Sequence, residues 1–294
     1  MATLREVRRR IAGVKSTQKI TKAMKMVSAA KLRRAQLAVV AARPYARAMR
    51  DLLQHLLVYA EGPVAAFVQP REVKNVAVVV VTSDRGLCGA FNSNLIRAAV
   101  QHLRKRYPEW NGQGRVRIYC VGKKATDFFS RRAFSVAEKF VGIFGHLTFI
   151  EAQRVARILV DGYTAGTFDR VDVIYNEFKS IAQQNIVVEQ FLPVPPAGVT
   201  NGAAPSTTAG EYIYEPSKAG ILESLLPKHL NFQIWRVLLE SNAAEQGARM
   251  AAMDNATENA NELIETLQLQ YNKARQASIT KELLEIVGGA EALR

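Results

Sequence analysis

The sequence is poor in cysteine and histidine, the residues that form disulfides in small folds or bind metal ions. It has two cysteines, Cys88 and Cys120, and four histidines that lie singly along the chain. Two distant cysteines form neither a disulfide framework nor the CxxC spacing of a zinc site. The low cysteine content therefore indicates a reducing, intracellular setting, and we expect no metal site.

A long apolar run is also missing. No purely apolar stretch is longer than VAVVVV at residues 76–81, which is far shorter than the ~20 residues that span a bilayer. The N-terminus is basic, but it has neither the apolar core of a secretory signal nor the serine-rich composition of an organelle transit peptide. We therefore expect no transmembrane segment.

Catalytic motifs are absent as well. The stretch SDRGLCGAFNSN (83–94) follows a predicted strand, at the place where open α/β sheets usually bind phosphate. It contains only Gly86 and Gly89, so the three-glycine dinucleotide motif is incomplete, and the sequence has no GxxxxGK[ST] phosphate loop. We interpret the stretch as a tight turn into a helix with Asn92 or Ser93 as N-cap. We expect no catalytic residue and no cofactor.

What the sequence does have is positive charge, concentrated at one end. Residues 1–50 hold 14 Lys and Arg and a single acidic residue, Glu6. The other 26 basic and 25 acidic residues nearly balance, so one segment carries almost all of the net charge of +14. Such a segment predicts an acidic or polyanionic partner. The plainer alternative is a solvated basic face.

The same segment has the hydrophobic pattern of one very long helix. Apolar and small residues recur in steps of three and four from Leu4 to Leu56, with an average close to the coiled-coil period of 3.5. A helix over residues 1–58 would be about 80 Å long, and Pro44 should kink it without ending it. A second stripe, rich in alanine, predicts a C-terminal helix over 217–294. We expect the two helices to form a thin antiparallel coiled coil.

The middle of the chain has a different pattern. Apolar strand-like runs at 75–83, 115–122 and in RVDVIYNEFKS and IVVEQFLPV alternate with helical segments over 74–194. This alternation predicts an open, mostly parallel, Rossmann-like α/β domain, with the last two strands paired as a hairpin. Residues 195–210 are rich in Pro, Gly, Ser and Thr and predict a flexible loop.

Three stretches of the chain resemble the γ subunit of bacterial F-type ATP synthase. They are STQKITKAMKMVSAAKLRRAQ (16–36), TSDRGLCGAFN (82–92), and the C-terminal ARMAAMDNATENANELI (248–264) with LQYNKARQASITKELLEIVGGAEAL (269–293). The resemblance implies a non-catalytic central rotor shaft that couples ion-driven rotation to ATP synthesis. It also implies partners, namely the α and β subunits of the α3β3 hexamer, the ε subunit and the membrane c-ring. The implied location is peripheral, on the cytoplasmic face of the bacterial inner membrane.

The resemblance also assigns roles to particular residues. Lys22, Met24 and Lys25 would face the acidic lever of a β subunit, and Arg249, Arg275 and Gln276 would form polar catches near the upper shaft. Residues from Ile279 onward, with Leu283 and Ile286, would sit in an apolar bearing. The basic rod would then turn inside an acidic sleeve.

Two alternatives come from other functional classes. A nucleic-acid-binding protein could use the basic helix on phosphates, but the segment lacks interleaved aromatic residues, and the C-terminal helix would have no role. A nucleotide-using α/β enzyme would need the phosphate loop that is missing here.

Overall fold

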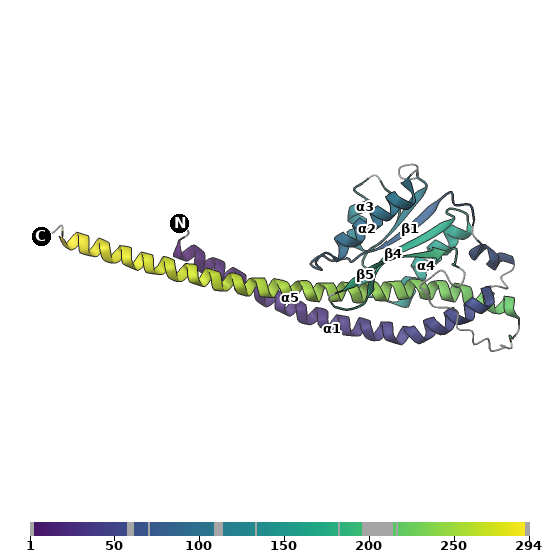
Figure 1. The fold of residues 1–294 in the computed structure, drawn as a ribbon, viewed down its shortest axis with the longest axis horizontal. Helices are drawn as coiled ribbons and strands as arrows, with labels where there is room; N and C mark the ends of the chain where they lie inside the picture. Colours follow the sequence, from purple (N-terminus) through teal and green to yellow (C-terminus); the bar gives the residue numbers. More distant parts are fainter. Residues whose placement is uncertain are drawn as a thin grey trace. The chain divides into compact units, whose positions relative to one another are not determined.

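The computed structural model (Figure 1) describes residues 3–291 except 58–61, 70, 109–113, 133, 182, 196–213 and 216. The loop expected at 195–210 falls outside the described residues, apart from Pro195. The described elements, in chain order, are α1 Leu4–Leu56, η2 Gly62–Phe67, β1 Val76–Val81, α2 Phe91–Arg106, β2 Val116–Val121, α3 Lys123–Phe129, β3 Ser135–Phe140, η4 Ile143–Gly145, α4 Phe149–Thr164, β4 Arg170–Phe178, β5 Gln184–Leu192 and α5 Lys218–Glu291.

Two very long helices form the ends of the chain. Helix α1 has 53 residues and α5 has 74. Helix α1 is rich in Ala, Leu, Lys and Arg and α5 in Ala, Leu and Glu, all of which are strong helix formers. Pro44 lies inside α1 and Pro227 inside α5, so α1 does continue through its proline as the sequence predicted. No described helix has the length and hydropathy needed to cross a membrane.

The chain forms two compact units. The helix-pair unit consists of Met1–Ala29 and Arg249–Arg294, and the sheet unit is Ala30–Ala248. Each long helix therefore contributes one end to the helix-pair unit and the other to the sheet unit. The predicted fold class, an antiparallel coiled coil of terminal helices with a central α/β domain, is confirmed.

The sheet has five strands in the order β3-β2-β1-β4-β5. The first four are mutually parallel, and β5 runs antiparallel to β4. The predicted hairpin of the last two strands is therefore confirmed. Strand β3 was missed from the sequence because it lies at an edge, and most of its residues are exposed or half-buried, so it has no continuous apolar run.

Helices cover both faces of the sheet unit. Strand β1 is buried along its whole length, which explains its unbroken apolar run. Ala77, Val79 and Val81 pack toward α4, the first part of α5 and the end of α1. The alternate residues Val76, Val78 and Val80 pack toward α2 and α3. The helical layers of this unit can be followed around the strands in Figure 1.

A buried carboxylate ties β4 to α2. Asp172 is 1% exposed, and its Oδ2 lies 3.1 Å from His102 Nε2 and accepts a 2.7 Å hydrogen bond from the Tyr107 hydroxyl. Arg170 Nε donates to Oδ1 at 2.9 Å. Burial raises the pKa of Asp172, but the hydrogen bond from His102, the charge of Arg170 and the hydrogen bond from Tyr107 outweigh burial, so its pKa is below the usual value.

We expect Asp172→Asn to lower the unfolding free energy by about 3 kcal/mol near neutral pH, because it breaks a buried charge network. The folded pKa is the lower one, so the stabilisation is present above the unfolded pKa of ~3.9 and disappears as pH falls through the folded value. Urea titrations from pH 7 to pH 2 should show the unfolding free energies of the wild type and Asp172→Asn converging as the pH falls. Asp161→Asn is the control, since Asp161 pairs with Arg157 at an exposed site and should matter little. A difference in unfolding free energy that stays the same at every pH would contradict the prediction.

Candidate functional site

The terminal helices lie antiparallel in the helix-pair unit, and side-chain contacts at four levels define their register. A step forward along α1 is matched by a similar step back along α5. The contacts are the hydrogen bonds Arg8–Tyr271 (2.6 Å) and Thr21–Thr257 (2.8 Å), the hydrogen bond from Gln18 to Asn261, and the ion pair Lys25–Asp254 (2.5 Å). All four contacts are polar, so they specify the direction and register of the two helices more strongly than a purely apolar seam would.

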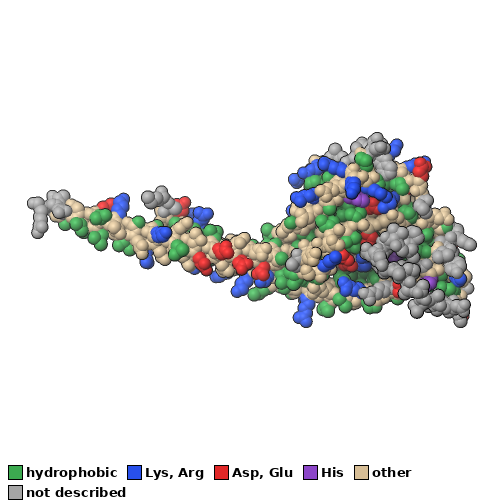
Figure 2. All heavy atoms as spheres, in the orientation of Figure 1, with side chains coloured by type: hydrophobic (Ala, Val, Ile, Leu, Met, Phe, Trp, Pro, Cys, Tyr) green, Lys and Arg blue, Asp and Glu red, His purple; other side chains and the backbone are tan. Residues whose placement is uncertain are grey.

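The seam itself is narrow. On α1 the buried seam includes the small polar residues Thr21 and Ser28, and on α5 it includes Ala260 and Ile264. Small side chains let helix axes approach closely but bury little apolar area per turn. The basic residues of α1 point outward instead, and the exposed ones include Arg5, Arg9, Arg10, Lys15, Lys19 and Lys22. Charged side chains along the paired helices are visible in Figure 2.

Helix α5 continues past the beginning of α1. Arg8 lies at the level of Tyr271 and α1 begins at Leu4, so the described part of α1 provides no partner for α5 much beyond Arg275. From Ile279 to Ala290 every residue is exposed. This stretch, the α5 tip, includes large apolar side chains that are 51–71% exposed, namely Ile279, Leu283, Leu284, Ile286 and Val287. Exposed apolar surface of this extent is typical of a contact site for another protein.

The crevice at the carboxyl ends of β1 and β4 is the other place where a site is expected. The chain leaves β1 toward β2 and returns from β3 to β4, so the strand order reverses here, and ligands of open α/β sheets bind at such a point. In this chain the place is filled by an apolar cluster of Cys88, Phe91, Ala244 and Ala248, with Phe178 packed against it. The chain's own side chains therefore occupy the usual ligand position.

The turn after β1 is held by its own polar groups. Helix α2 begins at Phe91 with Ala90 at the N-cap position and no side-chain cap, so the predicted cap by Asn92 or Ser93 is wrong. Asn92 instead accepts from the Ser83 N–H (3.0 Å) and donates to Cys88 Sγ (3.1 Å). The asparagine is used to close the turn, which leaves it unavailable as a cap.

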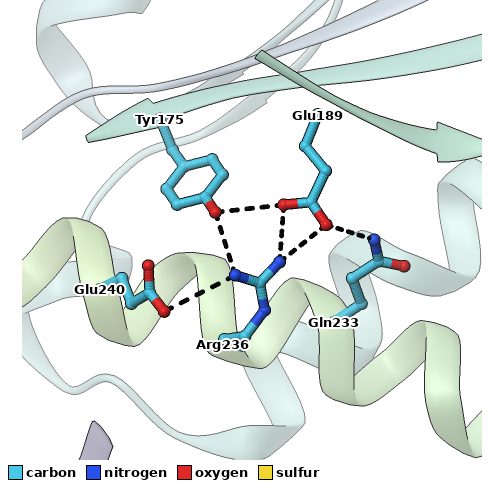
Figure 3. Close-up of polar contacts among 5 residues, drawn as sticks. All are labelled: Tyr175, Glu189, Gln233, Arg236 and Glu240. Carbon is cyan, nitrogen blue, oxygen red and sulfur yellow. Dashed lines mark hydrogen bonds and ion pairs between the residues drawn. The ribbon is translucent and has the colours of Figure 1, made fainter. Parts of the chain in front are cut away.

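A polar cluster lies between the sheet and α5 within the sheet unit (Figure 3). Arg236 of α5 donates from Nη2 to both oxygens of Glu189 on β5, at 2.8 and 2.6 Å, and from Nη1 to the Tyr175 hydroxyl of β4 at 3.0 Å. Gln233 donates to Glu189 at 2.9 Å. Glu240 lies 3.6 Å from Arg236 Nη1. Three elements of the sheet unit thus meet at one guanidinium.

The charges of this cluster are set by burial and by one another. Burial raises the pKa of Glu189, but the Arg236 charge and hydrogen bonds outweigh it, so the pKa is below its ordinary value. For Glu240 burial dominates, and the charges of Glu177 and Glu189 reinforce it against those of Arg236 and Arg43, so its pKa is raised. Glu189 is therefore the ionised partner of Arg236.

Comparison with known proteins gives a consistent result. A family model described as ATP synthase matches residues 3–293. The chain is 52% identical to the ATP synthase gamma chain of Chlorobaculum tepidum over the full length of both, and 50% identical to that of Chloroherpeton thalassium, covering all of this chain and 99% of the relative. The chain belongs to the ATP synthase gamma chain family. The resemblance found in the three sequence stretches is therefore confirmed.

Two solved structures share the fold. A chain in the structure of the central stalk and c-ring of the Tetrahymena thermophila mitochondrial ATP synthase is 28% identical to this chain with a TM-score of 0.59, and the match covers 81% of this chain and 99% of that one. A chain of the Euglena gracilis mitochondrial ATP synthase matches with a TM-score of 0.67 at 21% identity, covering 99% and 94%.

The residues for which the gamma-chain resemblance implied roles lie at separate levels of the helix-pair unit. Lys22 is exposed, and Met24 and Lys25 are half-buried, with Lys25 paired to Asp254. Arg249 is only 8% exposed. Arg275 and Gln276 are exposed just before the tip that carries Ile279, Leu283 and Ile286. The structure therefore distributes these residues along the helices and does not gather them into one pocket.

Sequence reasoning missed two groups of residues. Asp254 and Thr257 were not singled out from the sequence, and both contact α1. Their partnership with Lys25 and Thr21 is visible only when the helix register is known. Arg236 and Glu189 were also missed, although each is a charge inside an apolar stretch, QIWRVLL and IVVEQFL. A charge in such a position indicates a buried ionic partner.

Proposed function

We propose that this chain is the central rotor shaft of an F1 sector, coupling ion-driven rotation of a membrane ring to ATP synthesis at α/β catalytic sites. The observation that carries the proposal is the antiparallel helix pair that ends in an unpaired, apolar α5 tip, in a chain that matches gamma chains over its whole length. A stiff, thin pair of helices with an exposed basic surface suits a body that turns inside a close-fitting acidic sleeve.

The partners in this proposal are the α and β subunits of the hexamer, the ε subunit and the c-ring. The subunit is non-catalytic and lies at the cytoplasmic face of the bacterial inner membrane as a peripheral component. The 1–58 and 217–294 helices form the shaft, and 74–194 forms the head. Nucleic-acid binding, which rested on the basic helix alone, gains no support from family membership.

Particular residues take particular roles in this proposal. Lys22, Met24 and Lys25 meet the acidic lever of a β subunit, and the exposure of Lys22 supports this. Arg275 and Gln276 act as polar catches, and their exposure supports this. Arg249 has the same role in the proposal, but its 8% exposure does not add support to it. Ile279, Leu283 and Ile286 turn in an apolar bearing, which would cover apolar area that is solvent-exposed in the free chain.

The isolated chain should not hydrolyse ATP. Phosphoryl transfer needs a phosphate cradle and groups that stabilise the transferring phosphoryl, and the crevice where such a cradle could lie is filled by the cluster around Cys88 and Phe91. We expect phosphate release at background rates from the purified chain, and turnover once α and β subunits are added. Enzyme-like turnover by rigorously purified chain alone would defeat the proposal.

A further inference from the structure

We propose that Arg236 is the joint through which the sheet and helix α5 transmit torque to each other. The inference rests on the proposed rotor function and adds to it the residue that resists slippage inside the rotor body. It concerns only the sheet unit, because Arg236, Gln233, Glu189 and Tyr175 all belong to that unit.

Most of the contact between α5 and the sheet is apolar. Leu230, Ile234, Val237 and Leu238 of α5 share one buried cluster with residues of the sheet strands, including Tyr175. Hydrophobic attraction is non-directional, so it resists separation of the helix from the sheet much better than it resists sliding along the sheet or rolling on it. A rotor under load experiences sliding and rolling forces, because the ring turns one part while the catalytic subunits resist the other.

The Arg236 cluster supplies the direction that the apolar contact lacks. Arg236 Nη2 contacts both oxygens of Glu189 and its Nη1 contacts the Tyr175 hydroxyl, all at 3.0 Å or less. The planar guanidinium is therefore held through two of its nitrogens, which makes the contact sensitive to angle as well as distance. Gln233 lies about one turn earlier on the same face of α5 and donates a hydrogen bond to the same Glu189 carboxylate. Rolling or sliding of α5 would break several short bonds at once (Figure 3).

The mechanical role of the Arg236–Glu189 pair can be tested separately from its contribution to folding stability. A buried ion pair contributes little stability relative to well-packed apolar residues of similar size, because desolvation offsets much of the attraction. Breaking only one partner leaves an uncompensated charge, which destabilises strongly. The informative change is therefore the double variant Arg236→Met/Glu189→Leu, which removes the guanidinium together with its ionised partner. Glu240, the other carboxyl beside Arg236, has a raised pKa and can stay uncharged when Arg236 is absent, so we expect the variant to fold.

The experiment measures ions pumped per ATP hydrolysed by the complete membrane-bound complex, as the opposing ion gradient is raised. We expect the double variant to hydrolyse ATP at close to the wild-type rate in detached F1 and to lose at least about three-fold in ions pumped per ATP under load, with little loss without load. Arg236→Lys keeps the positive charge but loses the planar guanidinium, so its loss of ions pumped per ATP should lie between those of the wild type and the double variant. The control is Arg157→Met/Asp161→Leu, which removes an exposed ion pair within α4.

Wild-type pumping per ATP in the double variant at every load would overturn the proposal, as would an equal loss in the control. If the double variant does not assemble, Arg236→Lys decides in the same way: a load-dependent loss supports the joint, and normal coupling overturns it. Failure of the rotor proposal itself has a different signature, because complexes with the wild-type chain would then not couple hydrolysis to pumping at all.

Discussion

A disulfide between Thr21→Cys and Thr257→Cys should leave ATP turnover of the assembled complex close to normal, whereas one joining Lys25→Cys to the surrounding β subunit should abolish it. The two threonine hydroxyls are 2.8 Å apart across the helix pair, so the first bond links atoms that belong to one body. The second bond fixes a turning surface to its sleeve. Since a disulfide holds its Cα atoms ~4.4–6.8 Å apart, the shaft cannot turn past that point.

The measurement is steady-state hydrolysis before and after oxidation, with the extent of each crosslink quantified on non-reducing gels. Reduction should restore turnover in the shaft-to-ring case. The Thr21–Thr257 pair is the matched control for oxidation damage, because it adds the same chemistry a few residues away. Undiminished multi-turnover hydrolysis with a fully formed bond at Lys25 would show that this chain does not rotate. The bond site is far from the α5 tip, so fraying there cannot imitate rotation.

The sequence was sufficient to predict the architecture because the two kinds of element have very different periodicities. A stripe of period near 3.5 from Leu4 to Leu56 has no other compact solution than a long helix with a partner helix. The unbroken run at 76–81 consists almost entirely of valine and is followed by turn residues, which favours a strand buried on both faces. Edge strand β3 escaped because its exposed and half-buried residues show neither pattern.

The contacts that define the candidate sites could not be predicted, because they depend on relations between distant residues. Thr21 meets Thr257 only in one of several registers that the small seam residues would allow. Glu189 and Arg236 are 47 residues apart in the sequence, and no local pattern pairs them. Asn92 looked like a helix cap because caps are the commonest use of asparagine before a helix, and its true partner, Ser83, lies nine residues earlier.

The α5 tip should be unprotected against amide exchange in the free chain and become protected on assembly with α and β subunits. An isolated helix segment without tertiary packing is marginal in water, and every residue from Ile279 to Ala290 is exposed. Covering its large apolar side chains at ~1 kcal/mol each should slow exchange about 100-fold or more. Mass-spectrometric exchange on peptides from this segment, free and assembled, measures the change.

Replacing Ile279, Leu283 and Ile286 by Ser should remove most of that gain, because these side chains supply the apolar area that the bearing would cover. The matched control replaces Lys281, Glu282 and Glu285 by Ser in the same turns. It removes the exposed Lys281–Glu285 pair, which contributes little, and should keep the protection. If the control loses as much as the apolar triple, the segment is held by charge and not by burial. If amide exchange in this segment is the same in the free and assembled forms of both the wild-type chain and the control variant, no partner covers the α5 tip. The roles proposed for Ile279, Leu283 and Ile286 then fail, and the rest of the shaft assignment stands.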